Sequence, residues 1–118
     1  MAQLRVNNNV TPPLVVLVAG LANVAADVTA VPTITITHGR DGQHRPGSLH
    51  GLDAALDVRT HNFPSTRSKD AFVQSVRAKF PPPTYDVILE DRDGPNEHLH
   101  IEDNRAKLID VDTQQQLA

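Results

Sequence analysis

Two segments of the chain carry side chains that bind metal ions in other proteins. His50 and Asp57 lie seven residues apart, and His98 and His100 alternate some forty residues later. Two imidazoles and one carboxylate can hold zinc through three protein groups, which leaves a fourth coordination position for water. Zinc in such a site lowers the pKa of its water towards 7. The residue types therefore indicate a catalytic zinc site, with four candidate ligands.

Two acids lie near these histidines in the sequence. Side chains alternate between the faces of a strand, so His98 and His100 point the same way, roughly 7 Å apart. Glu97 precedes them, while Glu90 ends the preceding predicted strand. Glu97 is three residues from His100, an odd number, so in a regular strand the two side chains point to opposite faces. Glu97 faces the same way as His100 only if the chain bends near residues 95–96. Which of the two acids lies beside the histidines is therefore left open.

Three other polar features have simpler interpretations. His38 and His61 are expected to be solvated surface residues. Residues 91–94 have the D-x-D-G spacing of a calcium-loop fragment but lack its later ligands. We interpret this acidic stretch as a hairpin turn.

The elements that must position the candidate site follow from hydrophobic periodicity. The sequence predicts a helix over 13–27, with Thr11 as N-cap, although its valines leave a buried strand as the alternative. Strict alternation predicts a strand over 33–37, and a second strand over 52–59 carries Asp57. A helix is predicted over 66–80 from Phe72, Val76 and Phe80, followed by a hairpin with strands over 86–90 and 98–102.

This order of elements predicts a single α+β domain with a small antiparallel sheet and two main helices. Its 118 residues suffice for one core, expected over about 13–111 with loose termini at 1–11 and 112–118. Apolar residues make up 39% and aromatic residues 3%, so the core depends on aliphatic side chains. The absence of cysteine excludes thiolate zinc ligands and disulfides.

Charge and hydropathy limit the partners. The net charge of −3 and the scattered basic residues argue against nucleic-acid binding. The apolar run over 14–26 is too short to span a bilayer, and no basic segment precedes it as in a signal peptide. We expect a monomer without a membrane span, made in the cytoplasm.

The first metal-binding segment also matches a family motif. Ser48, His50, Ala55 and Asp57 stand at the spacing of S-x-H-x-x-G-x-A-x-D, with Asp53 at the glycine position, and H-x-H follows at 98–100. In these motifs the chain resembles the zinc peptidase superfamily of bacterial D-Ala-D-Ala carboxypeptidases, phage peptidoglycan endopeptidases and the hedgehog signalling domain. The resemblance covers roughly residues 30–103 and is nearest to small phage or prophage members.

The resemblance implies a hedgehog/DD-peptidase-like fold and a metallopeptidase that cleaves peptidoglycan stem peptides or cross-links by a zinc-activated water. It implies that zinc is held by His50, Asp57 and His100. His98 then binds the substrate carbonyl or its oxyanion.

The resemblance also implies roles for charged residues near the metal. Arg40, in the segment after the first main strand, corresponds to an arginine that contacts substrate. Glu97 stands at the ExxH spacing of the carboxypeptidase branch and is the expected general base, with Glu90 as the alternative.

Other functions are compatible with the same ligands. The hedgehog branch implies that the domain can serve as a non-catalytic, zinc-containing binding module. A zinc amidase shares the ligands and differs only in substrate. Which peptide bond is cleaved, and whether the enzyme is a carboxypeptidase or an endopeptidase, is left open.

Overall fold

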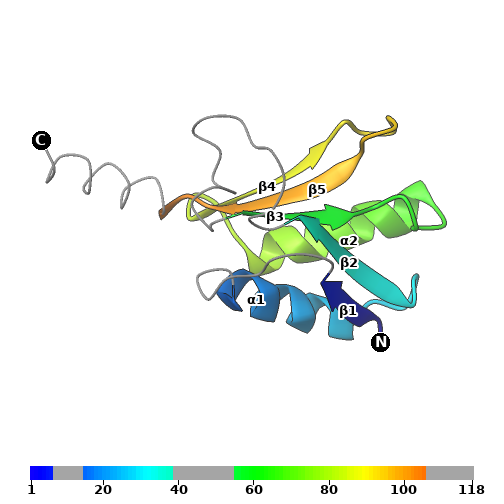
Figure 1. Cartoon of the computed structure of the whole chain (residues 1–118), viewed down its shortest axis with the longest axis horizontal. Helices are drawn as coiled ribbons and strands as arrows, with labels where there is room; N and C mark the ends of the chain where they lie inside the picture. The colour runs from blue at the N-terminus through cyan, green and yellow to red at the C-terminus, as the bar shows by residue number, and fades with distance from the viewer. Residues whose placement is uncertain (7–14, 39–54, 106–118) are drawn as a thin grey trace, which may run out of the picture.

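A β-sheet with two helices packed on one face forms the described part of the protein, residues 1–6, 15–38 and 55–105 of a computed structural model (Figure 1). The elements in chain order are β1 (Gln3–Val6), α1 (Val15–Ala26), β2 (Thr33–His38), β3 (Ala55–Arg59), α2 (Thr66–Lys79), β4 (Tyr85–Glu90) and β5 (His98–Asp103). The predicted α+β class is confirmed, and every helix and strand predicted within the described ranges is present.

The sheet has five strands in the order β1-β2-β3-β5-β4. Pairing is antiparallel from β2 to β4, as predicted, but β1 pairs with β2 in parallel. The sheet is therefore mixed, and Gln3–Val6 form a strand where the sequence predicts a loose arm. Parallel strands need a crossover connection, and α1 lies within the connection from β1 to β2.

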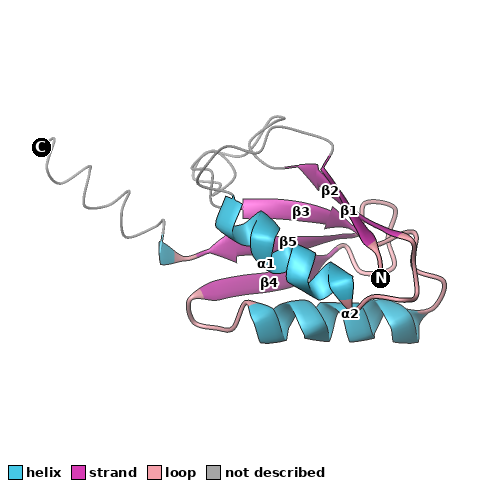
Figure 2. Cartoon of the chain, turned by 90° about the horizontal axis from the view of Figure 1, so that it is seen from below, coloured by secondary structure: helices cyan, strands magenta, loops and turns pink. Residues whose placement is uncertain are grey.

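The core lies between the sheet and the two helices (Figure 2). Alternate residues of the central strands are buried against apolar stripes of both helices: Ile34, Ile36, Leu56, Val58, Leu99 and Ile101 from the sheet, with Leu17, Leu21, Phe72, Val73 and Val76 from the helices. The valine-rich segment 15–26 is a helix, not a buried strand. Its buried residues Leu17, Leu21 and Val24 follow helical spacing, and their burial outweighs the low helix propensity of β-branched residues.

Helix α2 begins at a local signal in the sequence. The Ser65 side chain accepts a hydrogen bond from the Ser68 backbone N–H at 3.1 Å, and the Ser68 hydroxyl contacts the Ser65 backbone N–H in return. This capping box satisfies backbone donors that the first helical turn leaves unpaired. It fixes where α2 starts relative to the end of β3.

The sheet face opposite the helices carries the polar residues of the candidate site. Because side chains alternate along a strand, the residues between the buried positions of β3, β4 and β5 share this face. We call it the polar face; it includes Asp57, Arg59, Asp86, Glu90, His98, His100 and Glu102. Neither helix in the described part of the chain has the length and apolar character needed to cross a membrane.

Candidate metal centre and adjoining cleft

The register between β3 and β5 brings together two of the expected zinc ligands. Asp57 lies directly opposite His100, and the Asp57 Oδ1 atom is 3.0 Å from His100 Nδ1. Both side chains are largely buried, with 14% and 12% of their surface exposed. A carboxylate and an imidazole that already point at one another are a suitable donor pair for zinc.

The second ring nitrogen of His100 is also held by a carboxylate. Glu102, two residues further along β5, places Oε1 3.0 Å from His100 Nε2. Histidines that bind metal through one nitrogen usually donate the other N–H to a carboxylate, which fixes the ring and its tautomer. Glu102 is suited to this role, and the sequence-based prediction did not include it.

Acidic neighbours also affect the protonation of His100. Burial by itself lowers the pKa of an imidazole, but the hydrogen bond and charge of Asp57 act in the opposite direction. Together with the charges of Glu102 and Glu90 they raise the pKa of His100 above its ordinary value of 6.5. A metal ion that binds His100 competes with a proton for the ring nitrogen.

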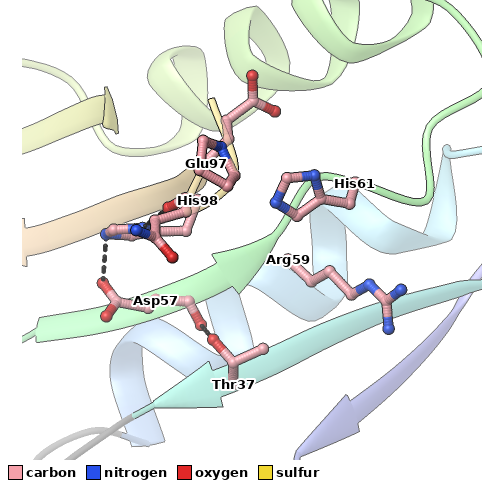
Figure 3. A pocket seen from close by; sticks show the side chains of 8 residues that line it. Thr37, Asp57, Arg59, His61, Glu97 and His98 are labelled. Atoms are coloured by element: carbon pink, nitrogen blue, oxygen red, sulfur yellow. Dashed lines mark hydrogen bonds and ion pairs between the residues drawn. The ribbon is translucent and has the colours of Figure 1, made fainter. Parts of the chain in front are cut away.

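His98 shares the polar face with His100, as strand parity predicts, and with Asp57 of the neighbouring strand. Its Nε2 atom is 3.0 Å from Glu90 Oε2 and 3.8 Å from Asp57 Oδ1 (Figure 3). Its Nδ1 atom is 2.8 Å from the Asn96 carbonyl oxygen. Glu90 lies directly opposite His98 in the β4–β5 register. Glu90, His98 and Arg59 therefore form one cross-strand row of the polar face, and His98 also approaches Asp57, which lies in the neighbouring row opposite His100.

Glu97 lies in a different environment. Its carboxylate points towards α2, away from Asp57 (Figure 3), and the residue is 5% exposed. Lys69 Nζ donates to Glu97 Oε2 at 2.8 Å, Thr60 Oγ1 donates to Oε1 at 2.6 Å, and the Asp93 backbone N–H donates to Oε2 at 2.7 Å. The carboxylate is thus bound by three donors on the helix side of the hairpin.

These contacts determine the ionisation of Glu97. Burial alone raises a carboxyl pKa, but the hydrogen bonds from Lys69, Thr60 and the Asp93 backbone, with the Lys69 charge, lower the pKa of Glu97 from 4.5 to about 2. The same hydrogen bond to Glu97 raises the pKa of Lys69, although burial opposes it. The two residues form a buried ion pair that joins α2 to the start of β5.

Two of the residues expected from the sequence, His50 and Arg40, lie outside the described residues. Within the ranges 1–6, 15–38 and 55–105, no group of three histidines and acids is arranged to hold a metal ion. Asp57 and His100 are the two expected ligands in those ranges, and their donor atoms suit zinc.

A cleft of about 590 Å³ adjoins the Asp57 and His98 side chains. The residues around it come from β2, β3, the start of β5 and the two turns that follow β3 and precede β5: Thr37, Asp57, Arg59, His61, Pro95, Asn96, Glu97 and His98. Arg59 and His61 are exposed and border the cleft away from Asp57 (Figure 3). The sequence predicts His61 to be an ordinary surface residue. Arg59 was not predicted as a site residue, although its position two residues after Asp57 on the same strand places both side chains on one face.

The acidic stretch before β5 is a turn, as predicted. The Asp91 carbonyl accepts a hydrogen bond from the Gly94 N–H at 2.8 Å, and the Asp91 carboxylate accepts one from the Asn96 N–H at 2.8 Å. Asp91 and Asp93 have φ of 50° and 62°, a left-handed region that aspartate tolerates better than most residues. The Asp91 carboxylate therefore serves the hairpin itself.

Comparison with known proteins gives no relative for this chain. No family model matches it, and neither a curated protein nor a solved structure does. The superfamily resemblance of the motifs therefore stays a prediction.

Proposed function

We propose that the chain is a zinc-dependent metallopeptidase with a hedgehog/DD-peptidase-like fold that hydrolyses peptide bonds in peptidoglycan stem peptides or cross-links. The observation that carries the proposal is the pairing of Asp57 with His100 across β3 and β5, beside His98 and a cleft. The reaction type follows from these donors, whereas the substrate class follows from the motif resemblance.

In this proposal Asp57 and His100 hold the zinc ion together with His50, and Glu102 orients His100. Bound zinc supplies a Lewis acid that polarises the scissile carbonyl and makes water a better nucleophile near neutral pH. The largely buried positions of Asp57 and His100 limit competition from bulk water for their donor atoms.

We assign the general base to Glu90. It lies on the polar face, its side chain is 43% exposed, and it contacts His98 at 3.0 Å. A base must accept a proton from the attacking water and return it to the leaving amine. Glu97 is poorly suited to this task, because its carboxylate faces α2 and its pKa is about 2.

His98 is assigned to the substrate. Its ring lies between Glu90 and Asp57, and contacts at both nitrogens restrict its orientation. An imidazole N–H held in this position can donate to the substrate carbonyl oxygen as negative charge develops there. Arg40 is a second candidate donor, from the motif resemblance alone.

Mass spectrometry of muropeptides tests the reaction and the substrate together. Purified peptidoglycan treated with the zinc-loaded protein should give shortened stem peptides or opened cross-links, and a chelator should abolish them. Unchanged muropeptides in the presence of stoichiometric bound zinc would contradict the proposal and favour a non-catalytic binding module.

A further inference from the structure

The cleft beside Asp57 has an exposed cationic end. Arg59 follows Asp57 by two residues on β3, so its side chain leaves the same face about 7 Å further along the strand. Arg59 also lies directly opposite His98 in the β3–β5 register. Arg59 therefore lines the same cleft as His98, and its guanidinium points away from Asp57 and His98 at the far end of the side chain (Figure 3).

The charge of Arg59 is not neutralised within the described part of the chain. There, Arg92 pairs with Asp70 and Arg105 with Asp103, but no hydrogen bond or ion pair involves Arg59. Two acids line the same cleft: Glu97 directs its carboxylate to Lys69, and Asp57 contacts His100. An exposed arginine beside a cleft, without an acid partner among the described residues, is available to a ligand anion.

His61 adds a second donor at the same end. It is exposed, lies two residues after Arg59, and turns its imidazole into the cleft opposite His98 (Figure 3). Like Arg59, it forms no hydrogen bond or ion pair with another residue in the described ranges. The fork of an arginine matches a carboxylate in a two-point contact, and a neighbouring imidazole N–H can complete such a site.

We infer that Arg59 and His61 form a carboxylate-binding subsite of the cleft, which selects peptides that carry a free carboxylate close to the scissile bond. The spacing of about 7 Å along β3 corresponds to about two residues of an extended peptide. The inference rests on the proposed peptidase function for its peptide ligand. The carboxylate is either the C-terminal group of the substrate or the side chain of an acidic residue.

Binding measurements with three peptides distinguish these sources. The probes are acetyl-Lys-D-Ala-D-Ala as the free acid, the same peptide as its C-terminal amide, and an amide-capped peptide containing D-Glu. Their affinities for the full chain are measured by NMR titration, so that the readout does not depend on turnover. If the free acid binds better than both amide-capped peptides, the subsite recognises the C-terminal carboxylate. If the D-Glu peptide binds better than the neutral amide, the subsite recognises an acidic side chain.

Arg59→Gln should weaken binding of the preferred carboxylate peptide roughly tenfold to a hundredfold and leave the neutral amide unaffected. Arg59→Lys should retain part of the affinity, because it keeps the charge and loses the fork. Arg67→Gln, which removes an exposed charge from α2, is the matched control and should bind all three peptides as the unaltered chain does.

The subsite is ruled out if the unaltered chain does not prefer either carboxylate peptide, or if Arg59→Gln binds the acid as tightly as the Arg67→Gln control. Discrimination between acid and amide without any cleavage would leave the subsite standing and remove the peptidase proposal. If all three peptides bind with equal affinity and all are cleaved, the subsite is ruled out and the peptidase proposal is supported.

Discussion

Asp57 and His100 face each other across β3 and β5, and Asp57 Oδ1 lies 3.0 Å from His100 Nδ1. This contact joins two segments that are 43 residues apart in the chain. It depends on a strand register that keeps both side chains on the polar face, since a slip of one residue would turn either of them towards the helices. The register between these strands is therefore the structural basis of the proposed metal site.

Replacing Asp57 should abolish high-affinity zinc binding. Asp57→Asn removes a charged oxygen ligand, and we expect the zinc dissociation constant to rise more than about 100-fold in calorimetric titrations. Asp86→Asn is the matched control, because Asp86 is an acid of the same face that lies opposite Glu102. Equal zinc affinity in both variants would contradict the assignment of Asp57.

Glu102 should tune the metal site without being essential to it. Glu102→Gln removes the carboxylate from His100 Nε2, and we expect zinc affinity to fall roughly tenfold to a hundredfold. The variant should still bind one zinc ion per chain when zinc is in excess. Complete loss of binding would instead make Glu102 a ligand, and unchanged affinity would remove its orienting role.

The two candidate bases should separate into a catalytic and a structural residue. Glu90→Gln should lower kcat by about 100-fold or more with zinc content and melting temperature preserved. Glu97→Gln should lower the melting temperature but keep kcat within a few-fold when measured well below that temperature. A folded, zinc-loaded Glu97→Gln protein without activity, beside an active Glu90→Gln protein, would reverse the assignment.

The buried pair of Lys69 and Glu97 should make stability depend on acid. The pKa of Glu97 is about 2 in the folded chain against 4.5 ordinarily, so the unfolded chain binds its proton first as the pH falls. The resulting stabilisation, about 3 kcal/mol, is complete above about pH 5 and is lost progressively towards pH 2.

Urea unfolding at several pH values measures this dependence. Glu97→Gln should be destabilised near pH 7, because it leaves Lys69 buried without its main partner, and should lose less stability than the unaltered chain as the pH falls. Asp70→Asn, which breaks an exposed pair with Arg92, should cost less than about 1 kcal/mol. Equal acid dependence in the unaltered and Glu97→Gln proteins would contradict the buried pair.

A single methyl group should disturb the packing of the two helices. Alanine at Gly20 would place its Cβ atom against the ring of Phe80, which is itself buried. We expect Gly20→Ala to lower the free energy of unfolding by about 1–3 kcal/mol, although alanine is the better helix former. Ala22→Gly, at an exposed position of α1, should cost only about 1 kcal/mol, and a stabilised Gly20→Ala protein would refute this packing.

Local patterns predicted most of the elements, whereas tertiary partners determined the rest. The apolar spacing of Phe72, Val76 and Phe80 was enough to place α2, and strict alternation was enough for β2. Gln3–Val6 could not be recognised, because this short strand is defined by parallel pairing with β2 across a whole helix. Its four residues do alternate polar and apolar, but so short a run does not define a strand by itself.

The site was predictable where strand parity applied. The common face of His98 and His100 followed from alternation, as did the expectation that Glu97 would point the other way without a bend, whereas the position of Asp57 on that face depends on the β3–β5 register. Its partner Lys69 was not predicted, because that contact depends on how α2 packs beside the hairpin. A signal was nevertheless present, since Lys69 occupies the apolar stripe of α2, three and four residues before Phe72 and Val73.

Zinc-dependent release of amino termini from purified peptidoglycan tests the central claim most directly. The metal-free full chain is titrated with zinc, and new amino groups are measured beside the Asp57→Asn variant. We expect the rate to rise until one zinc ion is bound per chain and to stay at background for the variant. No release at full zinc occupancy, or release by the variant equal to that of the unaltered chain, would contradict a zinc peptidase built on Asp57 and His100.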